Sequence, residues 1–382
     1  TLFPYTTLFR SDGIPIQDIK IGDKIAKTYF TMSYPKFLTE GWLAPIINLD
    51  KIFDVEVYDL SSETNEMYDT NEYVFGFESL NIPHSIYSIN PRITEPDLKL
   101  IKSHQVLNNY SKNDYVIKRL YIDIGDVSGK KLPVSLIYNK HKYSPNGKCP
   151  LFLYGYGSYG IAMETYFSYS RLSLLDRGIA FAVAHIRGGG ELGKTWHYDG
   201  RLNKKKNTFT DFITAAEYLI QNKYVAKDKL VIQGGSAGGL LIGNVINQRP
   251  ELFKAAILDV PFVDCLNTML DPDLPLTINE YDEWGNPSDD EEVFNYIKSY
   301  TPYENVTAQN YPNLLLNNGL NDSRVSYWEA AKFTAKLRVS KTDDNILILK
   351  TLMNAGHGGA SGRYQALHET TFNQSFMLKC LE

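Results

Sequence analysis

From residue 150 onward, short continuous apolar runs alternate with segments of helical period, and this alternation constrains the fold more than any other feature of the sequence. A strand that is apolar on both faces must be covered on both sides, which is typical of a parallel sheet between two layers of helices. Ligands of such sheets bind at the carboxyl ends of the strands. We expect strands at 150–157, 179–188, 229–235, 255–262, 313–319 and 345–352, and helices at 208–222, 237–248 and 327–338.

Residues 12–113 have a different sequence pattern, which is typical of β-structure. Short β-type runs such as VYDLSS and NEYVFGFESL are separated by clusters of Asp, Asn, Ser and Pro, with little helical period. A hairpin is expected next, from YVIKRLYIDI and LPVSLIYN. The chain therefore divides into an all-β region over 12–113 and an α/β region over 114–382.

Composition excludes several classes of function. The net charge of −5 over 382 residues gives no broad basic face for nucleic acid, and we interpret the run Lys204, Lys205 and Lys206 as a solvated face. No stretch approaches the roughly 18 apolar residues of a membrane span. The three cysteines lie far apart without a C-x-x-C pair, which favours neither a zinc site nor a disulfide framework. We expect no cofactor, no metal and no membrane or nucleic-acid partner, while the oligomeric state is not indicated.

The stretch GGSAGG at 234–239 stands between an expected strand and an expected helix, with Ser236 at its centre. A G-x-S-x-G in that position is typical of the nucleophile elbow of α/β-hydrolases, where small neighbours let the backbone turn sharply. The alternative is a glycine-rich turn without a catalytic role. In this context we interpret Ser236 as the nucleophile.

A serine nucleophile requires a base and an orienting carboxylate, and these follow the serine in the order acid, then histidine, in α/β-hydrolases. Asp322 follows the strand at 313–319, and His357 follows the strand at 345–352. A turn or capping role for Asp322 and core packing for His357 are the structural alternatives. The order and the strand-end positions predict a triad of Ser236, Asp322 and His357.

The oxyanion that forms on attack needs hydrogen-bond donors already in place. The backbone N–H of Ala237, directly after Ser236, is one candidate. In LYGYGSYG, at 153–160, no HGGG-type loop is present, but Tyr156 lies between two glycines and can supply a phenolic donor. Ordinary aromatic packing of Tyr156 is the alternative.

From about residue 150 to residue 365, the sequence resembles the prolyl oligopeptidase family of serine peptidases. The resemblance is carried by LYGYGSYG, RLSLLDRG, HIRGGGELGKTWHYDG, KKKNTFTDF, GGSAGGLLIGNVINQRPELFKA, VPFVD, LPLTINEYDEWGNP, GLNDSRVSYWEAAKFTAKLR and NAGHGGASGRY. It implies an α/β-hydrolase catalytic domain that follows a β-propeller. It also implies the triad and the oxyanion tyrosine at the residues named above, and an arginine, Arg324, that binds a substrate carbonyl. From the residues alone, Arg324 is a surface ion-pair residue.

The resemblance is strongest to the branch of the family that cleaves after Arg or Lys. Between Lys254 and Lys298 there are eleven acidic residues and no basic one, which on composition alone is a solvated acidic loop. A guanidinium, however, needs a carboxylate in its pocket. The resemblance implies that Glu280, and after it Asp282, supplies that carboxylate. Glu164 matches one of two acids of the next subsite, and the other acid is absent, which puts a preference for paired basic residues in doubt.

The resemblance also implies an amino-terminal propeller of seven blades. At about 40 to 50 residues per blade, the region 12–113 holds about two, and we interpret it as a propeller remnant. Residues 1–11 resemble the in-frame translation of a sequencing-library adapter, so we interpret them as an artefact outside the fold. Because an incomplete propeller leaves strand edges open, we expect the chain as written to be poorly soluble or to be an ungated hydrolase.

The function expected from the sequence is a cytoplasmic, cofactor-free serine endopeptidase that cleaves short peptides after Arg or Lys. The alternatives are a prolyl-type oligopeptidase or an esterase on the same fold, an inactive truncated fragment, and a non-catalytic binding scaffold.

Overall fold

A computed structural model describes residues 73–90, 98–125, 127 and 129–382. The chain forms two compact units. One consists of Thr1–Asn113 with Glu164–Tyr169, and the other consists of Asp114–Met163 with Ser170–Glu382. In the described ranges, no helix is both long and apolar enough to cross a bilayer.

The described part of the first unit contains a three-stranded antiparallel sheet in the order β1, β2, β3. Phe75, Phe77 and Ile89 are buried on it. The strands are β1 (Tyr73–Ser79), β2 (Ile82–Ile89) and β3 (Lys99–Ser103), and the 3₁₀ turn η2 (Lys112–Asp114) follows them. The expected strand NEYVFGFESL is therefore present as β1. The interpretations of residues 1–11 and of most of the propeller remnant concern residues outside the described ranges.

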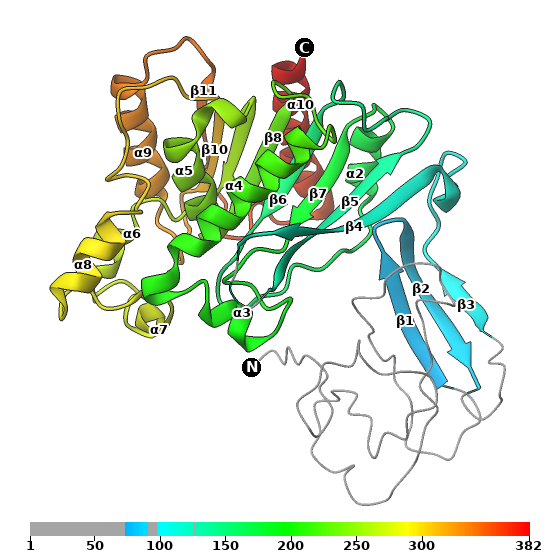
Figure 1. The fold of residues 1–382 in the computed structure, drawn as a ribbon, viewed down its shortest axis with the longest axis horizontal. Helices are drawn as coiled ribbons and strands as arrows, with labels where there is room; N and C mark the ends of the chain where they lie inside the picture. Colours follow the sequence, from blue (N-terminus) through cyan, green and yellow to red (C-terminus); the bar gives the residue numbers. More distant parts are fainter. Residues whose placement is uncertain (1–72, 91–97, 126, 128) are drawn as a thin grey trace, which may run out of the picture. The chain divides into compact units, whose positions relative to one another are not determined.

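The second unit is built on an eight-stranded sheet in the order β11-β10-β9-β8-β6-β7-β5-β4 (Figure 1). Strands β6 to β11 are parallel, and β4 and β5 form the antiparallel hairpin expected from the sequence. The strands are β4 (Tyr115–Asp123), β5 (Lys131–Asn139), β6 (Leu151–Gly155), β7 (Ala180–Ala184), β8 (Leu230–Gly235), β9 (Ala255–Asp259), β10 (Asn313–Gly319) and β11 (Leu347–Leu352).

Helices cover both faces of this sheet. The helices are α2 (Tyr169–Leu175), α3 (Lys194–Tyr198), α4 (Lys206–Gln221), α5 (Ala237–Gln248), α6 (Cys265–Met269), α7 (Tyr281–Trp284), α8 (Glu291–Lys298), α9 (Tyr327–Ser340) and α10 (Arg363–Leu381), with 3₁₀ turns η3 (Leu202–Lys204), η4 (Pro250–Leu252) and η5 (Ile278–Glu280). The apolar runs of β6, β8 and β9 are buried between these layers, as continuous apolar strands predict.

Helices α5 and α10 lie on opposite faces of the sheet (Figure 1). A Cβ on Gly234 would lie 2.4 Å from the Gly238 carbonyl oxygen of α5, so this face of β8 supports α5. On the other face, the amide of Asn317 donates to the Asp259 carboxylate at 2.7 Å and to Asn373 of α10 at 3.0 Å. The parallel strands thus end at one edge between two helical layers, and the loops after β6, β8, β10 and β11 emerge there.

Glu329 of α9 is a buried carboxyl group in the packing of α9 against α6, with 1% of the residue exposed. Its two oxygens accept from the Asp264 N–H at 2.9 Å and from the Thr268 hydroxyl at 2.7 Å. Burial, together with the nearby Asp264 charge, raises the pKa of Glu329 from its ordinary 4.5 to about 8. Glu329 therefore holds its proton at neutral pH in the folded state.

We expect Glu329→Gln to reduce the pH dependence of stability. Between pH 4.5 and pH 8 the folded protein binds the Glu329 proton more tightly than the unfolded chain does, so this group's stabilising contribution falls as pH rises. Because glutamine does not titrate, the unfolding free energy of the variant relative to the wild type should rise by on the order of 1–3 kcal/mol between pH 5 and pH 8.

Urea unfolding at both pH values measures this difference. Glu291→Gln, at an exposed position of α8, is the matched control for the loss of one carboxylate, and its effect is compared with that of Glu329→Gln at the same two pH values. An equal Glu329→Gln difference at the two pH values would contradict the assignment of the proton to Glu329.

Candidate active site

Ser236 stands at the sharp turn between β8 and α5, where the sequence predicts a nucleophile elbow. Its backbone has φ 56° and ψ −120°, a conformation that a non-glycine residue rarely adopts. The turn is possible because its neighbours lack side chains: a Cβ on Gly239 would lie 2.4 Å from Pro261 Cα. The Ser236 N–H donates to the Asp259 carbonyl at 2.8 Å, which fixes the turn to the end of β9.

The loops after β10 and β11 bring Asp322 and His357 together. Asp322 Oδ2 lies 2.7 Å from His357 Nδ1, and the other oxygen, Oδ1, accepts from the N–H groups of Arg324 at 2.8 Å and Val325 at 3.0 Å. The Asp322 carboxylate therefore caps its own turn and also binds the histidine, and its membership of a catalytic triad stays a prediction. A carboxylate on Nδ1 leaves Nε2 as the nitrogen that can accept a proton.

The Asp322 carboxylate is ionised in this arrangement. Only 1% of its side chain is exposed, and 18% of the His357 side chain is exposed. Burial alone would raise the pKa of Asp322, but hydrogen bonds from His357 and from two main-chain N–H groups outweigh burial and lower it. The pair therefore consists of a fixed anion and a partly accessible imidazole.

Tyr156 lies in the turn after β6, close enough to Ser236 for the serine side chain to act on the pKa of the phenol and lower it. The pKa of Tyr156 is raised to about 12, first by burial and then by the Glu280 charge, while the Arg324 charge acts to lower it. At neutral pH the phenol is therefore protonated and can donate. The structure thus brings Tyr156 to Ser236, and it brings Glu280 and Arg324 within electrostatic reach of Tyr156.

Ala237 is the first residue of α5 and is buried. The first N–H groups of an α-helix have no acceptor within the helix, and the helix dipole adds positive potential at this end. The Ala237 N–H and the Tyr156 hydroxyl are thus two donors beside Ser236. Two donors in this arrangement can stabilise negative charge on an oxygen bound next to the serine.

Glu280 is held by two neutral donors. Its Oε2 accepts from the Tyr159 hydroxyl at 2.8 Å and from the Trp284 indole N–H at 2.8 Å, and the two rings meet edge to face at 5.7 Å. Both of these hydrogen bonds go to the same oxygen. The carboxylate is therefore oriented by its neighbours while Oε1 is left as an acceptor for another group.

The sequence did not indicate that Glu283 binds residues close to Glu280 and Tyr156. Its Oε2 lies 2.7 Å from His197 Nε2, and its Oε1 accepts from the Tyr159 N–H at 2.9 Å. Its charge also contributes to the raised pKa of Tyr156. The signal in the sequence was the third acid of NEYDEW together with the histidine of KTWHYDG, but only the fold pairs them.

Two other expected substrate contacts, Asp282 and Glu164, have no described contact with the Glu280 carboxylate. Asp282 is exposed, and its main-chain carbonyl accepts from Arg201 at 3.1 Å. Glu164 belongs to the first unit, which is described by itself. Both roles therefore stay predictions.

The interpretation of the lysine run as a solvated face is wrong for Lys205. Only 1% of Lys205 is exposed, and its ammonium donates to the Gly157 carbonyl and to the Ser158 hydroxyl, each at 2.7 Å. Lys204 and Lys206 are exposed, as expected. Lys205 immediately precedes α4, whose inner face is buried, and this position turns its side chain inward.

The sequence profile of the Prolyl oligopeptidase family matches residues 165–382. The chain belongs to this family. Among curated proteins, this prolyl oligopeptidase family member is 43% identical over 342 residues to Protease 2 of Moraxella lacunata, covering 89% of this chain and 49% of that protein. It is 44% identical over 326 residues to dipeptidyl aminopeptidase BI of Pseudoxanthomonas mexicana, covering 85% of this chain and 44% of that protein.

Among solved structures, the chain is similar to oligopeptidase B from Trypanosoma brucei with covalently bound antipain. The TM-score is 0.76 at 42% identity, covering 82% of this chain and 44% of that chain. This family member thus spans about half the length of the relatives it matches. The prediction of an α/β-hydrolase domain is confirmed by the family match and by the observed sheet.

Proposed function

We propose that this chain carries the catalytic domain of a serine endopeptidase that hydrolyses short peptides on the carboxyl side of Arg or Lys, through an acyl-enzyme on Ser236. The observation that carries the specificity is the Glu280 carboxylate, which is fixed by Tyr159 and Trp284 and acts electrostatically on Tyr156. A guanidinium pairs well with an oriented carboxylate that keeps one oxygen available. The similarity to oligopeptidase B supports this assignment.

In the proposed reaction, Ser236 Oγ attacks the scissile carbonyl carbon while His357 Nε2 accepts the hydroxyl proton. The Asp322 carboxylate holds the ring and stabilises the imidazolium. The oxyanion is stabilised by the Ala237 N–H and the Tyr156 hydroxyl. When the C–N bond breaks, His357 returns its proton to the leaving amine. Water then attacks the ester carbon and gives a proton to His357, which passes it to Ser236 Oγ as the ester C–O bond breaks and the acid product leaves.

The finer parts of the proposal concern substrate binding. Arg324 is exposed and its charge reaches Tyr156, so its guanidinium is suited to bind a substrate carbonyl beside the reacting bond. Asp282 and Glu164 are proposed as secondary acidic contacts. We also propose that the substrates are short basic peptides and that the protein is cytoplasmic.

The test compares fluorogenic amides that differ only in the residue before the cleaved bond. We expect amino-blocked peptides ending in Arg or Lys to have kcat/KM values at least about 100-fold above that of a Pro-ended peptide. A better Pro-ended peptide would overturn the basic specificity. Faster turnover of a neutral nitrophenyl ester than of any peptide would favour an esterase. Cleavage confined to unblocked dipeptide amides would favour the activity in the name of the Pseudoxanthomonas relative.

A further inference from the structure

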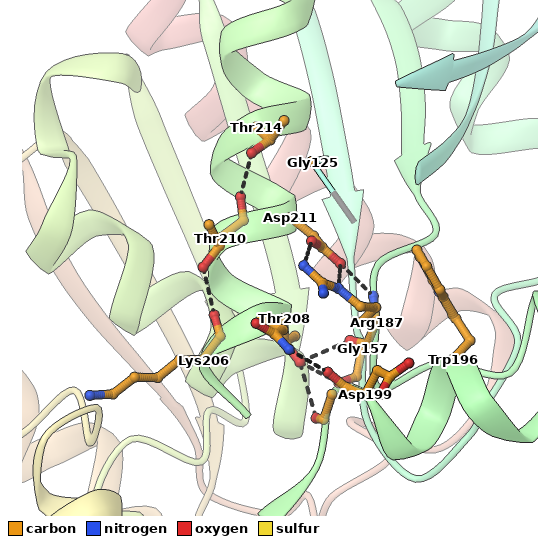
Figure 2. A network of polar contacts seen from close by, with 12 residues as sticks. Gly125, Gly157, Arg187, Trp196, Asp199, Lys206, Thr208, Thr210, Asp211 and Thr214 are labelled. Carbon is orange, nitrogen blue, oxygen red and sulfur yellow. Dashed lines mark hydrogen bonds and ion pairs between the residues drawn. The ribbon is translucent and has the colours of Figure 1, made fainter. Parts of the chain in front are cut away.

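Three polar side chains spaced three residues apart, one directly before α4 and two on its buried side, bind neighbouring loops. Lys205, directly before the helix, binds the turn at 157–158. The Thr208 hydroxyl donates to the Arg187 carbonyl at 2.8 Å, and the Asp211 carboxylate pairs with the Arg187 guanidinium at 2.8 Å and 2.5 Å (Figure 2). Residues at this spacing share one face of a helix. This face therefore fixes two loops that follow β6 and β7.

The two loops are packed main chain against main chain. A Cβ on Gly188 would lie 2.1 Å from the Gly157 carbonyl oxygen, and a Cβ on Gly157 would lie 2.6 Å from Thr208 Cγ2. Gly157 also has φ +68°, which favours glycine. The Gly157 carbonyl is thus enclosed, and the Lys205 ammonium donates to it at 2.7 Å, with a longer contact of 3.5 Å from the Thr208 hydroxyl.

A lysine is an unusual hydrogen-bond donor for a buried main-chain carbonyl group. The hydrogen-bond acceptors of Lys205 are a carbonyl and a hydroxyl, both neutral, and its ammonium lies 4.9 Å from the centre of the Trp284 ring. Burial lowers the pKa of Lys205 to about 8, and the nearby Glu283 carboxylate on α7 opposes that decrease. A buried cation with neutral partners is costly for folding, so simple core packing does not account for it.

The turn that Lys205 holds begins directly after Tyr156. We propose that Lys205 is a positioning residue, which fixes the turn at 157–158 and thereby sets the Tyr156 hydroxyl against the oxyanion formed at Ser236. This inference rests on the proposed function and adds a residue to its machinery. Lys205 itself does not touch the substrate, because it acts through the main chain next to Tyr156.

The test is a double-mutant cycle between Lys205→Met and Tyr156→Phe on an Arg-ended peptide amide. Lys205→Met should lower kcat by about 10- to 100-fold with little change in KM, because a displaced donor weakens transition-state binding alone. Tyr156→Phe should lower kcat by about 10²- to 10³-fold. The double variant should lose no more than Tyr156→Phe, since Lys205 has no effect without the phenol.

Lys204→Met is the matched control, because Lys204 is the exposed neighbour paired with Asp199. Its kcat should stay within about twofold of the wild type. Losses that multiply in the double variant, or an equal loss in Lys204→Met, would overturn the inference while leaving the proposed function intact. A wild-type chain that hydrolyses no peptide would overturn both.

Ser158→Ala covers the case in which Lys205→Met does not fold. It removes one of the two acceptors of the ammonium and leaves the other. A several-fold loss of kcat that disappears in the Tyr156→Phe background supports the inference. No loss, or the same loss in both backgrounds, overturns it.

Discussion

Ser236→Ala should lower kcat for an Arg-ended peptide amide by at least about 10⁴-fold, because the acyl-enzyme cannot form without the hydroxyl. The substitution leaves the glycine neighbours of the elbow unchanged. Because alanine is smaller than serine, it should fit the same turn. Thermal unfolding should therefore be nearly unchanged while activity is lost. The measurement is initial rates on matched protein preparations.

Ser288→Ala is the control for this variant, because Ser288 is exposed and lies in the loop before α8. It should keep wild-type rates. If Ser236→Ala kept more than about a tenth of the wild-type kcat, the nucleophile would have to be another group.

Glu280→Gln should lower kcat/KM for Arg- and Lys-ended peptides by about 10²-fold or more, because a charged substrate group loses its partner. The glutamine oxygen can still accept from Tyr159 and Trp284, so the pocket should keep its shape. Turnover of a neutral substrate should change little. The measurement is the ratio of kcat/KM for Arg-ended and neutral peptides.

Asp273→Asn is the matched control, since Asp273 is an exposed acid of the same acidic stretch. It tests whether the total charge of the stretch, and not one carboxylate, attracts basic substrates. Equal losses for Asp273→Asn and Glu280→Gln would contradict a dedicated pocket and support the interpretation as a solvated acidic loop.

The elements of the α/β-hydrolase domain were predictable because their signals are local. Continuous apolar runs identified β6 to β11, and the glycines around Ser236 identified the turn into α5. The pairing of Asp322 with His357 also followed from sequence, because both residues lie in loops after neighbouring parallel strands, which end at the same edge of the sheet.

The environment of these residues was less predictable because it depends on packing between distant segments. In the sequence, Lys205 belongs to a run of three lysines that is typical of an exposed surface. Its side chain is buried because α4 packs against the turn at 157–158. Glu283 and His197 are separated by 86 positions, and neither has a local signal for the other. Glu280 was placed first among the acidic residues because of the family resemblance. Its two hydrogen-bond donors, Tyr159 and Trp284, were identified only from the structure.

Ser236 is proposed as the nucleophile that attacks the bond on the carboxyl side of a basic residue. A phosphonate ester that carries an arginine-like side chain tests it, because attack by a nucleophile leaves a stable phosphonyl group on the attacking atom. Tandem mass spectrometry of the treated 382-residue chain should place this group on Ser236. The label should be lost in Ser236→Ala and should form more slowly in Glu280→Gln. A label on another residue, or none in a chain that hydrolyses Arg-ended peptides, would contradict the account.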